Sequence, residues 1–176
     1  MTIKVKDVAT EIIEGAKKLR TPAQKIPFFK LKLVKGRSIK LPVSKIEAQS
    51  DLVRVAKMEL ANLPHEEVLA IGLDGTMRII GVVRVSQGGV GGAAMTAQEV
   101  IRPMLAMGAT AFVVAHNHPS GDPTPSREDY TMTDHIKKAA ECVHLSMLDH
   151  IVIGGIRGGG YTEIMNRYAT GTFAKD

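Results

Sequence analysis

Two histidines and an aspartate stand at a spacing that suits a metal site. His116 and His118 close the apolar segment 109–115, which we expect to form a β-strand. Side chains alternate along a strand, so two histidines separated by one residue point to the same side. Asp129 follows a loop with three prolines and falls in the first turn of an expected helix, where the helix dipole also favours a carboxylate. Two imidazoles and one carboxylate leave the fourth tetrahedral position open for water, which is typical of a catalytic zinc site.

The same residues also have a purely structural interpretation. Ser126-x-x-Asp129 is a capping box, in which Ser126 begins a helix and the acid stands at its third position. A single histidine at a strand end is more often a surface or hydrogen-bonded residue than a ligand. These interpretations leave unexplained why two histidines, a Pro-rich loop and the acid occur together, so we favour the metal site.

The full string has the form of a known motif. His-x-His, seven residues, Ser, two residues and Asp is the JAMM metalloprotease motif, with residues 119–125 in the seven positions. The surrounding HNHPSGDPTPS resembles RadC-type proteins, a bacterial branch of the JAMM/MPN domain. The segments EVIRP at 99–103 and LDHIVIG at 148–154 are similar to the same family. The resemblance covers about residues 40–165.

The resemblance implies a role for each matching residue. His116, His118 and Asp129 would be ligands of Zn²⁺. Ser126 matches the motif serine, whose hydroxyl helps to stabilise the oxyanion of the tetrahedral intermediate. The family also needs an upstream glutamate as general base for a metal-activated water.

The glutamate has more than one candidate in this sequence. Glu66 and Glu67 are adjacent, and since neighbouring strand residues face opposite sides, only one of them can reach the metal. We choose Glu66, because the resemblance to RadC-type proteins places their glutamate there when residues are counted back from Leu73-Asp74. Glu99 is a third candidate, but it also fits a capping box with Thr96. For Asp149 and His150, at the start of a strand, we expect a supporting role rather than ligation.

The remaining pattern predicts the elements that position these residues. We expect a helix over 7–19, a helix that begins at Ser44 with Glu47 in its capping box, and a strand from about residue 66 to 73. An Asp74-Gly75 turn, a partner strand over 77–86, a Gly-rich loop, and a helix from Thr96 to Gly108 follow. A long amphipathic helix over 126–148 then leads to a strand over 149–155 and a short one over 161–164.

This order predicts an α/β fold with a mixed β-sheet flanked by helices. The resemblance implies a single JAMM/MPN-type domain with a cytidine-deaminase-like layout. We place it at 44–165, after a basic N-terminal helix and arm at 1–43 and before a C-terminal tail at 166–176.

Composition indicates the charge distribution of the chain and the cellular compartment that we expect for it. The chain has 176 residues and a formal charge of +5, but residues 1–45 hold 12 Lys and Arg against 3 acidic residues, whereas the remainder holds 11 against 15. The single Cys142 excludes an internal disulfide framework and suits a reducing cytoplasm. With no secretory signal pattern and no apolar run near the roughly 20 residues of a membrane span, we expect a cytoplasmic protein.

Two functions remain open at this point. The first is a zinc-dependent hydrolase of amide or isopeptide bonds, acting on a peptide or isopeptide substrate that the sequence does not identify. The second is a DNA-associated accessory protein, in DNA repair or a mobile element, with a structural or vestigial metal. The basic segment 1–45 would then contact a nucleic acid or an acidic partner.

Overall fold

The computed structural model describes residues 34, 36–87, 96–155 and 160–165, all within the unit Leu33–Asp176. The expected helix over 7–19, most of the Gly-rich loop and the tail at 166–176 lie outside the described residues. Within the described residues, three helices and five strands follow one another. In order they are α2 (Gln49–Leu60), β1 (Glu67–Leu73), β2 (Ile79–Gln87), α3 (Ala97–Met107), β3 (Ala111–His118), α4 (Arg127–Glu141), β4 (Ser146–Gly154) and β5 (Tyr161–Glu163).

The strands form one mixed sheet in the order β2-β1-β3-β4-β5. β1 pairs antiparallel with both β2 and β3, whereas β3 and β4 run parallel, joined through α4, and β5 adds antiparallel to β4. Val68 of β1 lies opposite His116 of β3, and Val114 of β3 lies opposite His150 of β4. His116 therefore lies between Val68 of β1 and Val152 of β4, two residues along β3 from the position opposite His150.

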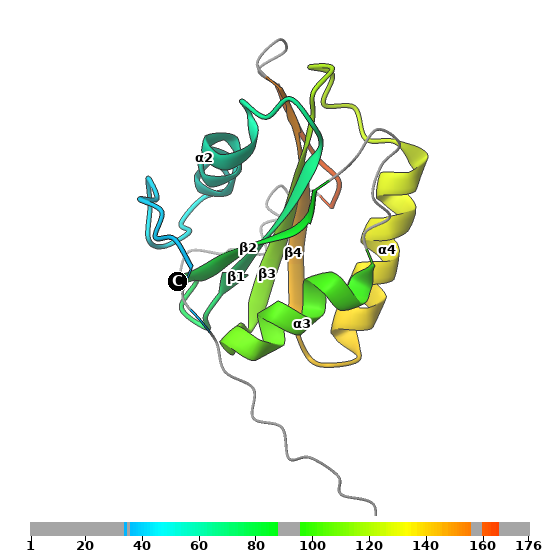
Figure 1. Ribbon diagram of the computed structural model, residues 1–176. Coiled ribbons are helices and arrows are strands. Elements are labelled where there is room, and N and C mark those ends of the chain that lie inside the picture. Colours follow the sequence, from blue (N-terminus) through cyan, green and yellow to red (C-terminus); the bar gives the residue numbers. More distant parts are fainter. Residues whose placement is uncertain (1–33, 35, 88–95, 156–159, 166–176) are drawn as a thin grey trace, which may run out of the picture. The chain divides into compact units, whose positions relative to one another are not determined.

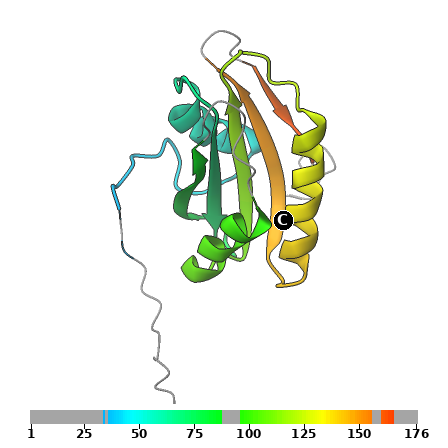
Figure 2. The same ribbon diagram turned by 45° about the vertical axis from the view of Figure 1, so that its right-hand side comes forward.

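Helices cover both faces of the sheet (Figures 1 and 2). On β1, Leu69 and Ile71 pack with α2, whereas Val68 and Ala70 pack with α3 and α4. The same alternation holds on β3, where Phe112 belongs to the face of α3 and α4. Because both faces are covered, β1 and β3 read as continuous apolar runs rather than as alternating strands. This arrangement confirms the predicted α/β fold with a mixed sheet flanked by helices.

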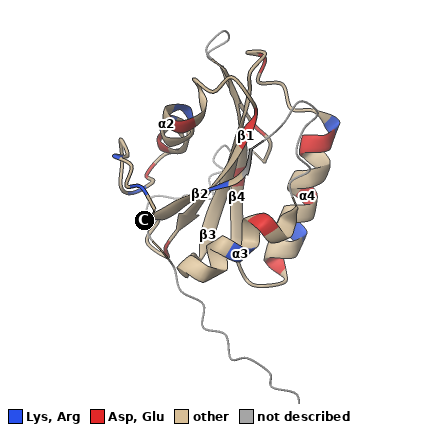
Figure 3. Ribbon diagram, in the orientation of Figure 1, with Lys and Arg blue, Asp and Glu red and all other residues tan. Residues whose placement is uncertain are grey.

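Charged residues are absent from the central strand β3 and occur mainly on the exposed side of the covering helix α4. Figure 3 shows no Lys, Arg, Asp or Glu on β3 and several on α4. Glu128, Asp134 and Lys138 of α4 are all exposed. Among the helices that the structure describes, none combines the length and apolar character needed to cross a bilayer.

The start of α2 differs from the sequence-based expectation. Ser44 and Glu47 lie before the helix, which begins after Ala48. The carboxylate of Asp51 accepts the backbone N–H groups of Glu47 and Ala48, each at 3.0 Å. The carbonyl of Ser44 instead accepts the N–H of Ile79 at 3.0 Å, so this segment is tied to β2. Pairing with the sheet therefore overrides the local capping pattern.

The end of α4 was also predicted wrongly. The helix stops at Glu141, and His144 adopts a φ of 55° before the chain enters β4. The N–H of Leu145 returns to the carbonyl of Ala140 at 3.0 Å, which closes the helix end. Leu145 and Met147 are buried in the same cluster as the helix, and this continuity of apolar residues mimics a longer helix. The predicted α3, with Thr96 and Glu99 forming its capping box and Gly108 its C-cap, is confirmed.

Candidate metal centre

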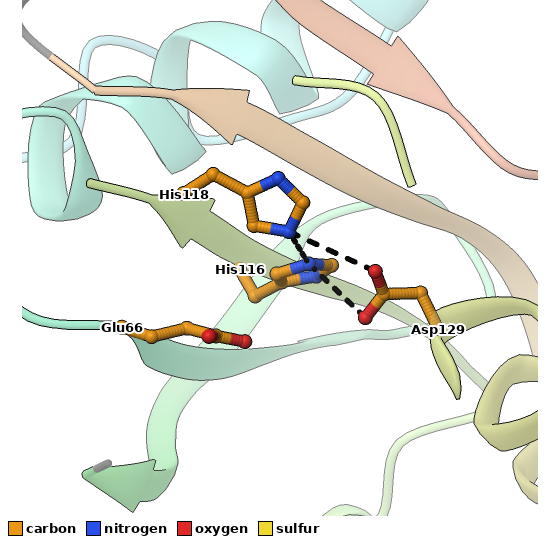
Figure 4. Close-up of side chains that lie close together, drawn as sticks. All are labelled: Glu66, His116, His118 and Asp129. Carbon is orange, nitrogen blue, oxygen red and sulfur yellow. Dashed lines mark hydrogen bonds and ion pairs between the residues drawn. The ribbon is translucent and has the colours of Figure 1, made fainter. Parts of the chain in front are cut away.

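Four side chains converge at the end of β3. His116 and His118 come from the strand itself, Asp129 from the first turn of α4, and Glu66 from the residue just before β1. One potential ligand atom of each lies within 4.8 Å of the others. Figure 4 shows Glu66 and Asp129 approaching the two imidazoles from opposite sides. The structure thus brings together the residues that the motif and the choice of Glu66 single out.

The spacing of the ligand atoms suits a single ion. The Nε2 atoms of His116 and His118 are 3.0 Å apart, and the Asp129 carboxylate lies 3.3 Å from the former and 3.7 Å from the latter. A tetrahedral zinc ion with bonds of about 2.0–2.1 Å separates its ligand atoms by about 3.3–3.4 Å. The three residues therefore form a group that could hold a metal ion.

The capping box is present and it orients Asp129. Oδ2 of Asp129 accepts both the backbone N–H and the hydroxyl of Ser126, each at 2.7 Å, while Ser126 Oγ accepts the N–H of Asp129 at 3.1 Å. The carboxylate that caps α4 is the same carboxylate that faces the histidines. The predicted capping box is therefore present, and its carboxylate also belongs to the group that could hold a metal ion.

The carboxylate of Asp129 and the imidazole of His118 shift each other's protonation. Burial favours the neutral form of Asp129, but hydrogen bonds from His116, His118 and Ser126 outweigh it and hold the pKa of this carboxyl far below its usual range. The Asp129 hydrogen bond raises the pKa of His118 against its partial burial. His118 also donates from Nδ1 to the carbonyl of Asp122 at 2.8 Å, so Nε2 is the nitrogen that faces the cluster. The site is thus built around one firmly ionised carboxylate.

The three candidate glutamates lie in different places. Only Glu66 belongs to the convergent group. Glu67 is buried on β1, where its carboxylate contacts Arg84 at 3.0 Å and His65 at 2.8 Å. Glu99 accepts the N–H and hydroxyl of Thr96 as the cap of α3. Alternation along the strand explains why Glu66 reaches the group and Glu67 does not. Val68 and Ala70 lie on the face of His116, and Glu66 continues this series of every second residue.

Comparison with known proteins agrees with this geometry. A family model described as a RadC-like JAB domain matches residues 46–164, more than half of the chain. The chain belongs to the RadC-like JAB domain family. It is 36% identical over 104 residues to a UPF0758 protein of Carboxydothermus hydrogenoformans, which covers 59% of this chain and 46% of that protein. A UPF0758 protein of Rhodobacter capsulatus is 34% identical over 150 residues, covering 85% and 66%. The chain spans about half the length of the first of these relatives.

Behind the four convergent side chains, the RadC-like domain has a buried set of polar residues. Nδ1 of His116 lies 2.8 Å from Nε2 of His150, whose Nδ1 lies 2.6 Å from the Thr133 hydroxyl. Complete burial, followed by the charge of His116, lowers the pKa of His150 to about 3. Sequence reasoning expected a supporting role for His150 but missed Thr133. Its position four residues after Asp129 on α4, facing the sheet, was the available signal.

Asn117, between the two histidines, points to the other side of the sheet and holds the backbone around Glu66. Its Oδ1 accepts the N–H of Glu67 at 2.9 Å, and its Nδ2 donates to the carbonyl of His65 at 3.0 Å. These two contacts bracket Glu66 at the point where the pairing of β1 with β3 ends. The fully buried amide thus replaces the strand pairing that would otherwise fix Glu66.

Replacing Asn117 with alanine is expected to lower the free energy of unfolding by about 1–3 kcal/mol, because the buried N–H of Glu67 and the partly buried carbonyl of His65 lose their partner. Urea unfolding of the metal-free protein measures this loss. Asn62→Ala, at an exposed position after α2, is the matched control. Equal stability of the two variants would show that the amide does not hold this segment.

The loop between His118 and α4 packs against β4 without room for a side chain. The carbonyl of His118 accepts the N–H groups of Gly121 and Gly155, each at 3.0 Å. A Cβ at Gly154 would lie 2.5 Å from the carbonyl oxygen of Gly121. Because that neighbour is backbone, the loop itself would have to move.

Gly154→Ala is therefore expected to destabilise the protein by about 1–3 kcal/mol, the usual effect of overpacking. Thermal or urea unfolding checks this value. Gly75→Ala serves as the control, since no atom lies within 4 Å of a Cβ at that position. A Gly154→Ala protein as stable as the control would contradict the close packing of this loop.

Proposed function

We propose that this RadC-like JAB domain is a zinc-dependent hydrolase of amide or isopeptide bonds. One observation carries the proposal: ligand atoms of His116, His118 and Asp129 lie 3.0–3.7 Å apart, close to the separations at a tetrahedral zinc ion, with the carboxylate of Glu66 on the opposite side. Three protein ligands leave a coordination position for water, whereas structural zinc sites are closed by four.

The surroundings of the site also support catalysis. His116 is buried, but Glu66, His118 and Asp129 are each accessible to solvent, so a substrate could reach them. Bound zinc would supply Lewis acidity, which polarises a carbonyl and lowers the pKa of a water molecule to about 7. In our proposal the chain's own carboxylate at Glu66 accepts the proton of that water and returns it to the leaving amine.

Ser126 is proposed to stabilise the negative charge that develops on the substrate's carbonyl oxygen. Its hydroxyl stands at the N-cap of α4, where it donates to Asp129 in the structure. The N-terminal end of a helix carries a partial positive charge. A hydroxyl donor at this place is therefore suited to an oxyanion.

The test uses zinc-loaded protein and two substrate pools, one of linear peptides and one of peptides joined through a lysine isopeptide bond. Cleavage is expected to stop on chelation, to return with added zinc, and to be lost in His118→Ala but retained in His135→Ala, at an exposed position on α4. Zinc-loaded protein that cleaves neither pool, or cleavage that His118→Ala leaves unchanged, would contradict the proposal.

We also propose nucleic-acid binding as a second candidate function, because residues 1–45 carry 12 basic and 3 acidic residues. Phosphate contacts of this kind weaken linearly with the logarithm of salt concentration. Salt-dependent DNA binding that is lost on deletion of residues 1–45 would support this candidate, and absence of binding at low salt would exclude it.

A further inference from the structure

A buried chain of hydrogen bonds joins two of the candidate metal ligands from behind. It begins at the backbone carbonyl of Asp129, which the hydroxyl of Thr133 approaches to 2.6 Å. The same hydroxyl lies 2.6 Å from Nδ1 of His150, and Nε2 of His150 lies 2.8 Å from Nδ1 of His116. Thr133, His150 and His116 are 4%, 1% and 1% exposed, so bulk water does not compete for these contacts. We call this set the Thr133–His150 relay.

The chemistry of the end groups fixes the direction of every hydrogen bond in the relay. A carbonyl oxygen can only accept, so the Thr133 hydroxyl donates to Asp129 and offers its lone pairs to His150. Nδ1 of His150 must then carry the proton that it donates to Thr133. A neutral imidazole has one donor and one acceptor nitrogen, so Nε2 of His150 accepts from Nδ1–H of His116.

These hydrogen-bond directions determine the state of Nε2 of His116, the nitrogen that faces the candidate metal site. In neutral His116 the proton is then on Nδ1 and Nε2 carries a lone pair, whereas only protonated His116 can also donate from Nε2 to Asp129. Nε2 is the atom that lies 3.3 Å from the Asp129 carboxylate and 3.0 Å from Nε2 of His118. We propose that Thr133 and His150 are positioning residues, which hold His116 in the Nδ1–H tautomer so that Nε2 is ready to bind a metal. The inference rests on the proposed function in that it assumes a metal at this site.

The relay also accounts for residues that the convergent group itself leaves unexplained. His150 is polar and fully buried on β4, opposite Val114 in the sheet and in contact with Thr133 of α4. Thr133 returns its hydroxyl to the carbonyl four residues earlier, a contact that slightly weakens a helix. Outer hydrogen-bond partners of metal-binding histidines orient the ring and fix its tautomer. The relay supplies such a partner to the more buried of the two histidines.

Two variants test the relay. His150→Phe keeps an aromatic ring but removes both nitrogens, and we expect the affinity for Zn²⁺ alone, measured by chelator competition, to fall about 10- to 100-fold. Thr133→Val keeps the shape of the side chain but removes the hydroxyl, and we expect a loss of about 3- to 10-fold, as for a single hydrogen bond. Thr133→Ser, which restores the hydroxyl, should bind zinc as the wild type does. His135→Phe, at an exposed position on α4, is the control for the first substitution.

A second readout separates tautomer control from general loosening of the fold. Long-range ¹⁵N–¹H spectra of the zinc-free protein, recorded at about pH 8 where an unperturbed histidine is neutral, report which nitrogen of His116 carries the proton. We expect Nδ1–H in the wild type, Thr133→Ser and His135→Phe, and a shift toward Nε2–H in Thr133→Val. Thr133→Val keeps this test decisive even if His150→Phe does not fold.

The outcomes distinguish this inference from the proposed function. Zinc affinity within about twofold of wild type in His150→Phe, or an unchanged His116 tautomer in Thr133→Val, would overturn the relay while the metal site stands. A wild-type protein that binds no zinc would overturn the proposed function. In that case the spectra of the zinc-free protein still decide whether the relay fixes His116.

Discussion

Replacing Glu66 with glutamine is expected to reduce hydrolysis by about 10²- to 10⁴-fold, the usual contribution of a general base, while zinc remains bound. The amide keeps the size of the side chain but cannot accept a proton. Zinc should remain because His116, His118 and Asp129 are still present, and their ligand atoms lie 3.0–3.7 Å apart. The measurement is the rate of cleavage of a substrate found in the peptide pools, together with the zinc content of each variant.

The control for this variant is Glu128→Gln, which makes the same chemical change at an exposed residue in the first turn of α4. It should cleave at the wild-type rate. If Glu66→Gln retains full activity, Glu66 is not the base. If it loses zinc together with activity, the carboxylate acts as a ligand and the assigned role is wrong.

Replacing Asp129 with alanine is expected to have two separable effects, because one carboxylate serves both the cluster and the helix cap. Zinc affinity should fall by more than the roughly 10- to 100-fold typical of an outer hydrogen-bond partner, since a ligand itself is removed. The metal-free protein should also lose about 0.5–2 kcal/mol of stability, because the Ser126–Asp129 capping box is broken.

Ser126→Ala separates the two effects. It removes the same cap from α4 but leaves all three candidate ligands, so it should lose similar stability and less zinc affinity than Asp129→Ala. Chelator competition and urea unfolding of both variants provide the comparison. Equal zinc affinities in the two proteins would mean that Asp129 only caps the helix.

The convergence of the site could be predicted from local patterns. His116 and His118 share a face because strand side chains alternate, and the loop and capping box bring Asp129 back to that face. The choice between Glu66 and Glu67 needed more than this rule. Alternation says that only one glutamate can reach the site, but the register of β1 on β3, with Val68 opposite His116, decides which one.

The start of α2, the end of α4 and the role of Thr133 depend on tertiary packing and could not be predicted from local sequence patterns. Ser44 carries a good capping pattern, yet its backbone pairs toward β2 and α2 begins later. Leu145 and Met147 continue the apolar pattern of α4 because both elements pack into one cluster, so the helix end was misplaced. The position of Thr133 four residues after Asp129 is only a weak signal in the sequence, since its role arises when α4 lies against His150 of β4.

The most direct test of the metal centre is the zinc content of the purified full chain, measured together with X-ray absorption at the zinc edge. The structure leads us to expect one zinc per chain, held by nitrogen and oxygen ligands at about 2.0–2.2 Å, and loss of that zinc in His116→Ala. A chain that takes up no stoichiometric zinc, that retains it without His116, or that shows a sulfur ligand at about 2.3 Å would contradict the account.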